Sequence, residues 1–201
     1  NMGPTNTMPG IVNGGVLATS VAGVQVTFDG VAVPLLSVSA GEIDLMAPFE
    51  LAGKTTTAVQ VQYNGVKSNA VHVGIAGPIN FFGLVSGLPI QLLAIFNEDF
   101  THNSKSNPAR AGSEMILYVS GVGQSVPPSL DGQVNASPLA AAPSPVRILV
   151  NGGSLAIPFA GAAPGLAAGI FQINFIAPQA GVSFLDFTVG QARSTFSVVV
   201  Q

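Results

Sequence analysis

The chain has 201 residues, of which 48% are hydrophobic and only 7% are charged, and its formal net charge at pH 7 is -3. Soluble domains usually contain about 25% charged residues, so this surface is largely neutral and has no basic patch for a nucleic acid. The absence of cysteine excludes disulfides and thiolate metal sites, and no apolar run approaches the ~20 residues of a membrane helix.

Two β-hairpins are predicted in the first 77 residues. Asp29-Gly30 and Asn64-Gly65 each separate two apolar runs, and such dipeptides are strong signals for a tight hairpin turn. Alternation of apolar and polar residues on both sides of each turn indicates strands with one buried face. The predicted strands are 24–28 with 31–36, and 57–63 with 66–73.

The second part of the chain begins after Gly77-Pro78, where the composition changes on both sides. A third hairpin is predicted around Asn151-Gly152, and no helix is expected. Residues 101–110 and the Pro/Ala/Ser-rich stretch 124–145 are predicted to be loops. The other predicted strands are 89–96, 114–120, 146–150, 155–159, 170–176, 183–189 and 195–200.

A repeated hexapeptide shows that the chain contains two copies of one β-rich unit. Ile43-Asp44-Leu45-Met46-Ala47-Pro48 returns as Ile173-Asn174-Phe175-Ile176-Ala177-Pro178, and such repeats reveal the architecture directly. Short strands with regular spacing and Gly/Pro turns are typical of sandwiches. The predicted fold is therefore all-β, with two tandem immunoglobulin-like β-sandwiches at residues 1–77 and 78–201.

The first copy lacks a strand that the second copy has. The number of residues that separates Gly123 from Val146 is close to the number that separates Gly3 from Val24. Asn1-Met2-Gly3 therefore matches the end of the strand segment at residues 111–123. A sandwich without that strand exposes backbone and part of its core, and each buried unsatisfied amide costs about 1–3 kcal/mol. Either the polypeptide continues upstream of residue 1, or a neighbouring subunit donates a strand.

This gap is the basis of the functional prediction. We expect assembly through β-strand pairing between copies, giving a homo-oligomer or a fibre, because little net charge opposes association and no residue set indicates chemistry. The residues predicted to take part are Val24, Val26, Phe28, Asn1, Met2 and Gly3.

Several longer motifs resemble the C-terminal domain family of large secreted acidobacterial proteins, the Solibacter-type repeat family, whose units are similar to IPT/TIG domains. Members usually have a further strand before the Gly-Pro that corresponds to Gly3-Pro4. The resemblance implies an extracellular or cell-surface location and a non-catalytic region. It is carried by residues 20–30, 34–36, 41–44, 63–69, 107–113, 117–118, 121–124, 131–132 and 160–166.

Polar residues that could carry chemistry are few. His72 lies in a predicted strand and His102 in a polar loop, and neither has the partners that a triad or a metal site needs. Asn97, Glu98 and Asp99 offer oxygen atoms but not the order of a calcium loop.

Three further patterns are better explained by structure than by function. Glu42 and Asp44 share one strand face, but no cleft of aromatic residues accompanies this pair of carboxylates. The glycine-rich segment from Gly161 to Gly165 lacks the lysine of a phosphate loop. Asn135 begins a glycosylation sequon, but Pro138 follows the sequon directly. We therefore expect no enzyme activity, no cofactor, no metal and no small-molecule substrate. The alternatives to a filament subunit are a spacer or adhesion module of a larger secreted protein and, with less support, a carbohydrate-binding module.

Overall fold

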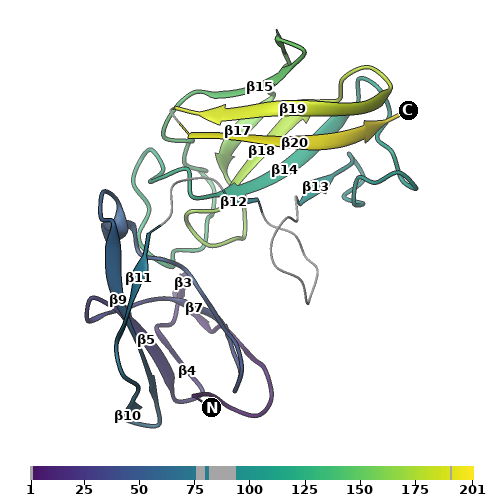
Figure 1. Ribbon diagram of the computed structural model, residues 1–201. Helices are drawn as coiled ribbons and strands as arrows, with labels where there is room; N and C mark the ends of the chain where they lie inside the picture. The colour runs from purple at the N-terminus through teal and green to yellow at the C-terminus, as the bar shows by residue number, and fades with distance from the viewer. Residues whose placement is uncertain (1, 76–79, 82–93, 191) are drawn as a thin grey trace. The chain divides into compact units, whose positions relative to one another are not determined.

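The computed structural model describes residues 2–75, 80–81, 94–190 and 192–201. It divides into two compact units, and Figure 1 shows the course of the chain through them. Unit 1 also contains two short segments from the second half of the sequence, both of which lie within the predicted domain 78–201. Unit 1 consists of Asn1–Gly77, Ser129–Asn135 and Gly165–Ala168, and unit 2 of Pro78–Pro128, Ala136–Pro164 and Gly169–Gln201.

Unit 1 is a sandwich of two antiparallel sheets, with a small additional hairpin. The smaller sheet has the order β1-β7-β8, and the larger sheet has the order β10-β9-β5-β4, with β11 also paired to β9 and β6 to β5. The strands are β1 (Met8–Pro9), β4 (Ser20–Val21), β5 (Val24–Phe28), β6 (Val31–Ala32), β7 (Leu35–Val38), β8 (Ile43–Leu45), β9 (Thr56–Tyr63), β10 (Val66–Lys67) and β11 (Val71–Gly74), with the additional hairpin formed by β2 (Val12–Asn13) and β3 (Val16–Leu17) and a 3-10 turn at Phe49–Leu51.

Unit 2 is a larger sandwich with the same plan. One sheet has the order β12-β14-β18-β17, with β13 also paired to β14, and the other has the order β16-β15-β19-β20. These strands are β12 (Asn80–Phe81), β13 (Ile95–Phe96), β14 (Glu114–Ser120), β15 (Val146–Val150), β16 (Gly153–Ser154), β17 (Phe159–Ala162), β18 (Phe171–Ile176), β19 (Gly181–Val189) and β20 (Ala192–Val200). The prediction of an all-β fold with two sandwiches is confirmed.

All three predicted hairpin turns are present. Asp29, Asn64 and Asn151 have φ angles of 51°, 47° and 50°, and the glycine after each also has a positive φ. Two consecutive residues with positive φ give the type I′ turn, which matches the twist of the flanking strands. The hairpin turns predicted from Asn-Gly and Asp-Gly are therefore confirmed.

Two predicted strands are interrupted by proline. Pro34 divides the predicted strand 31–36 into β6 and β7, which belong to different sheets. In unit 2, residues 155–158 of the predicted strand 155–159 are not in a strand, and Pro158 lies between β16 and β17, which also belong to different sheets. Proline has no N–H to donate to a ladder, so both copies change sheets at the same point. Of the predicted strand 89–96, residues 89–93 lie outside the described residues and residues 95–96 form β13.

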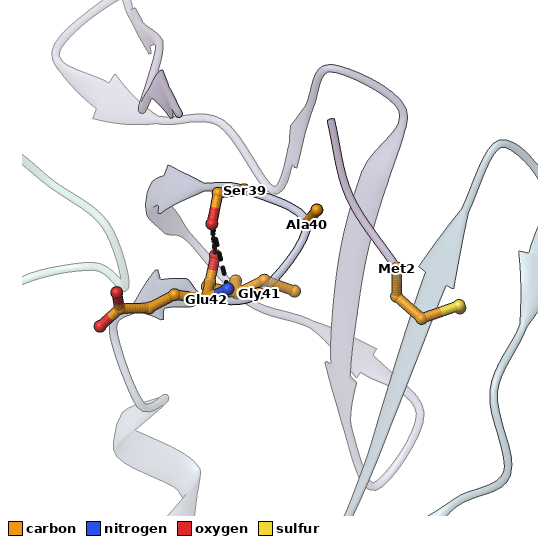
Figure 2. A pocket seen from close by; sticks show the side chains of 6 residues that line it. Met2, Ser39, Ala40, Gly41 and Glu42 are labelled. Carbon is orange, nitrogen blue, oxygen red and sulfur yellow. Dashed lines mark hydrogen bonds between the residues drawn. The ribbon is translucent and has the colours of Figure 1, made fainter. Parts of the chain in front are cut away.

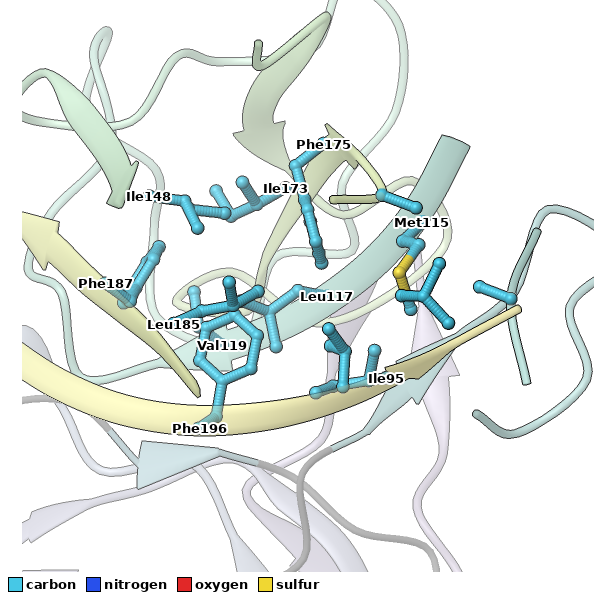
Figure 3. Packing of buried hydrophobic residues seen from close by; sticks show 14 of the residues in the cluster. Ile95, Met115, Leu117, Val119, Ile148, Ile173, Phe175, Leu185, Phe187 and Phe196 are labelled. Carbon is cyan, nitrogen blue, oxygen red and sulfur yellow. The ribbon is translucent and has the colours of Figure 1, made fainter. Parts of the chain in front are cut away.

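The two hydrophobic cores differ greatly in size. Among the described residues, unit 1 has 6 buried residues in its core cluster, all from β4, β5, β7 and the turn before β7, whereas unit 2 has 16. The core of unit 2 includes three side chains of β14, namely Met115, Leu117 and Val119. Figure 3 shows Leu117 and Val119 of this strand packed with Phe196.

A turn that the sequence did not predict gives a test of the backbone of unit 1. Ala22 connects β4 and β5 with a φ of 48°, and Gly23 follows with a φ of 80°. An alanine in this region costs about 1–2 kcal/mol, whereas asparagine tolerates it. We predict that A22N stabilises the protein by about 0.5–1 kcal/mol, measured by urea unfolding. The matched control A52N, at an exposed residue with a φ of -56°, should change stability by less than about 0.5 kcal/mol.

Asp29 ties its hairpin turn to β9 and predicts a pH dependence. Its carboxylate accepts hydrogen bonds from the Ala58 N–H and from Lys54 Nζ, both at 2.8 Å, and these bonds lower the pKa of Asp29 to about 2. Because the pKa is lower in the folded than in the unfolded chain, the stabilisation is present above about pH 4 and disappears as the pH falls towards 2. Unfolding of D29N and wild type should therefore differ at pH 6 and converge near pH 2; a difference that is constant over this range would contradict the prediction.

Candidate assembly site

The residues predicted to receive a strand do not lie at an open edge. Val24 and Val26 of β5 are buried, with 0% and 1% exposure, and Phe28 is half-buried. β5 is paired with β9 on one edge and with β4 and β6 on the other. An added strand has no free backbone here, and Asn1 lies outside the described residues.

β8 has an open edge in the described part of unit 1. In unit 2, β18 pairs with β17 on one side and with β14 on the other. In unit 1, β8 pairs with β7, and no strand formed by the described residues pairs with its other edge. Because β8 and β18 both contain residues of the repeated hexapeptide, the strand that the described part of unit 1 lacks is the counterpart of β14.

Across the sandwich from the missing strand of unit 1 lies the sheet that contains β9 and β11, and these two strands correspond to β19 and β20 of unit 2. In unit 1, Val59 of β9 lies opposite Val71 of β11; in unit 2, Leu185 of β19 lies opposite Phe196 of β20. Directly opposed residues of two strands point to the same face of the sheet. Since Val59 packs against the core of unit 1, Val71 also points to the core side.

Core-facing side chains of unit 1 are exposed where their counterparts in unit 2 are buried. Val71 and Val73 have exposures of 51% and 38%, whereas Phe196 and Val198 have 3% and 0%. The repeat shows the same contrast, because Ile43 and Leu45 are half-buried and the matching Ile173 and Phe175 are fully buried.

These features define one surface, which we call the acceptor edge. It consists of the unpaired backbone edge of β8 and the core-facing side chains of Ile43, Leu45, Val71 and Val73. An exposed strand edge invites pairing with another strand, and uncovered apolar side chains add a hydrophobic driving force. The sequence indicates that a strand is missing, but it predicts the residues of β5 rather than those of β8 as its neighbour.

The N-terminal segment reaches the beginning of β8. Met2 and residues 39–43 line an open cavity of about 330 Å³, and Figure 2 shows Met2 beside the turn at Gly41, with the side chain of Glu42 directed away from it. Gly3 is buried against the Ser39 carbonyl, where a Cβ atom would clash. Met2 and Gly3, two of the predicted assembly residues, therefore lie close to the acceptor edge.

Acidic side chains accompany the acceptor edge. Glu42 precedes β8, Asp44 lies within it and Glu50 follows in the 3-10 turn. Asp131 accepts a hydrogen bond of 3.0 Å from the Phe49 N–H, and burial, together with the neighbouring Glu50, raises the pKa of Asp131. Among the described residues, the ion pairs of the chain do not involve any of these four acids.

The remaining candidates do not form a reactive or metal-binding site. No group of three or more His, Cys, Asp or Glu side chains among the described residues could hold a metal ion. His72 is exposed in β11, and His102 lies against the Phe96 ring with centroids 4.5 Å apart. Asn97 donates to the Asn107 carbonyl within a loop network, and Asn135 is 6% exposed.

Comparisons with known proteins add little. No protein-family model and no curated protein matches the chain. The chain is similar to a solved structure described as "Crystal structure of the S-layer protein SbsC domains 4 and 5", with a TM-score of 0.26 and 10% identity over 79% of this chain and 61% of that one. A likeness of this size carries no conclusion about function. In the described part of the chain, helices with the length and apolar character for crossing a membrane are absent.

Val73 at the acceptor edge is exposed, whereas its counterpart Val198 in unit 2 is buried. We therefore predict that a polar atom lowers the free energy of unfolding less at Val73 than at Val198. V73T, at the exposed position, should change the free energy of unfolding by less than about 0.5 kcal/mol. V198T, at the buried counterpart, should cost about 1–3 kcal/mol, because it buries a hydroxyl without a partner. Urea unfolding of both variants measures the difference; equal losses would mean that the position of Val73 is covered.

Proposed function

We propose that the chain is a non-catalytic structural module of an extracellular assembly, in which a β-strand from another copy completes unit 1. The observation that carries the proposal is the acceptor edge. Unit 2 fills the same position with β14, which pairs with β18 from Glu114↔Ile176 to Val119↔Phe171 and buries three side chains. The edge of unit 1 offers the same two kinds of contact, backbone pairing and apolar burial.

Composition supports association of this kind. A net charge of -3 spread over 201 residues gives weak self-repulsion, and strand addition obtains its affinity mainly from backbone hydrogen bonds. A contact between the acceptor edge of one copy and a different segment of the next is heterologous, and such contacts generate filaments when they do not close. The extracellular location rests on the family resemblance.

A second candidate is a spacer module in which the completing strand belongs to the same polypeptide. The observation that favours it is the position of Met2 and Gly3 at the beginning of β8. In unit 2, β14 runs antiparallel to β18 and ends beside Phe171, at the start of that strand. A strand leading directly into Met2 would take the same course along β8.

One extended variant tests both candidates. A copy of the seven-residue β14 sequence, joined to the residue before Met2, should fill the acceptor edge in the same molecule. Its three apolar side chains would be buried against the core-facing residues of unit 1, as Met115, Leu117 and Val119 are buried in unit 2, and its backbone would pair with the free edge of β8. We expect backbone amides of β8 to gain hydrogen-exchange protection.

The matched control has aspartate at the three core-facing positions of the extension and should give no protection. Association is measured by sedimentation over a range of concentrations. Filament formation predicts that wild type associates and that the filled variant is monomeric. If the wild type is monomeric and the extension protects β8 from hydrogen exchange, strand donation is rejected and the spacer is supported. If the extension does not protect β8, both candidates are rejected.

A further inference from the structure

The two copies differ at the residue that faces the neighbouring strand on the outer side of the sheet. In unit 2 this residue is Asn174, whose side-chain amide donates a hydrogen bond of 2.9 Å to the Glu114 carboxylate of β14. The matching residue of unit 1 is Asp44. The strand beside β18 therefore meets a hydrogen-bond donor, whereas a strand beside β8 meets a carboxylate.

The surroundings of Asp44 leave it able to bind an incoming group. Its described side-chain hydrogen bond comes from the Ser37 hydroxyl of β7, which engages Oδ2, and Asp44 is exposed. Glu42 adds a second negative charge two residues earlier, and the ion pair described within unit 1 joins Lys54 to Asp29 instead. No described cation compensates Asp44.

We infer that the strand accepted by β8 carries a lysine, an arginine or another hydrogen-bond donor next to Asp44, at the position that Glu114 occupies in β14. This inference rests on the proposed strand addition at the acceptor edge. Opposite charges across neighbouring strands are favourable and like charges are unfavourable. The partner is thus an apolar strand with a cationic or donor group on its outer face.

The inference also limits which strand of a second copy can bind. β14 itself would place Glu114 next to Asp44, and pairing of β8 with β8 of another copy would bring two Asp44 carboxylates close together. Both arrangements bring like charges into contact. The acidic edge therefore selects against these two forms of self-pairing and in favour of a strand of different sequence.

Four extended chains test the inference. The seven-residue β14 copy is joined before residue 1 with either glutamate or lysine at its first position, and each version is combined with wild-type Asp44 or with D44N. With Asp44, the lysine version should unfold about 2–6 °C higher than the glutamate version. With D44N this preference should vanish or reverse, since asparagine can donate to glutamate as Asn174 does.

The outcomes separate the two proposals. If neither extension protects β8 from hydrogen exchange, strand addition at the acceptor edge is rejected. If both extensions protect β8 equally and residue 44 has no influence, strand addition stands and the cationic preference is rejected. The preference should also weaken in 1 M salt, where the screening length is about 3 Å.

Unit 2 provides a control that needs no extension. N174D places two carboxylates together at Glu114 and should lower the unfolding temperature, and E114K in the same chain should restore it. Failure of this rescue in unit 2 would overturn the pairing rule on which the inference depends.

Discussion

Pairing along the strand of the repeated hexapeptide determines how complete each sandwich is. In unit 2, β18 has a partner on both edges, and β14 supplies backbone hydrogen bonds and core side chains together. In unit 1, β8 has one described partner. A single strand provides both contributions, so the exposure of Val71 and Val73 in the opposite sheet has the same origin as the unpaired edge of β8.

Local structure could be predicted from the sequence because its causes are local. The turns at Asp29, Asn64 and Asn151 follow from residues that tolerate a positive φ. The order of strands in a sheet is not local: Glu114 and Asn174, which share a hydrogen bond, are 60 residues apart. The sequence therefore predicts the missing strand beside Val24–Phe28, its neighbour along the chain, whereas the free edge of β8 lies in the other sheet.

The exchange of Asp44 for Asn174 shows what the internal repeat adds to the structure. Asp44 and Asn174 stand at the same position of the repeated hexapeptide. In the structure both side chains make hydrogen bonds between neighbouring strands, Asp44 as an acceptor from Ser37 and Asn174 as a donor to Glu114. The sequence could not show that Glu114 is the neighbour, because that requires the register of β14 on β18.

An open strand edge also promotes aggregation, and the charges along the edge affect that tendency. Strand edges in natural proteins are protected by charged residues that oppose pairing between identical edges. Glu42 and Asp44 supply two such charges at β8. The free energy that each contributes is small, since an exposed ion pair contributes about 0.2–1 kcal/mol. Discrimination needs only the difference between attraction for one strand and repulsion for another. On this proposal, the residues that keep copies from pairing edge to edge are the same ones that choose the strand that completes the sandwich.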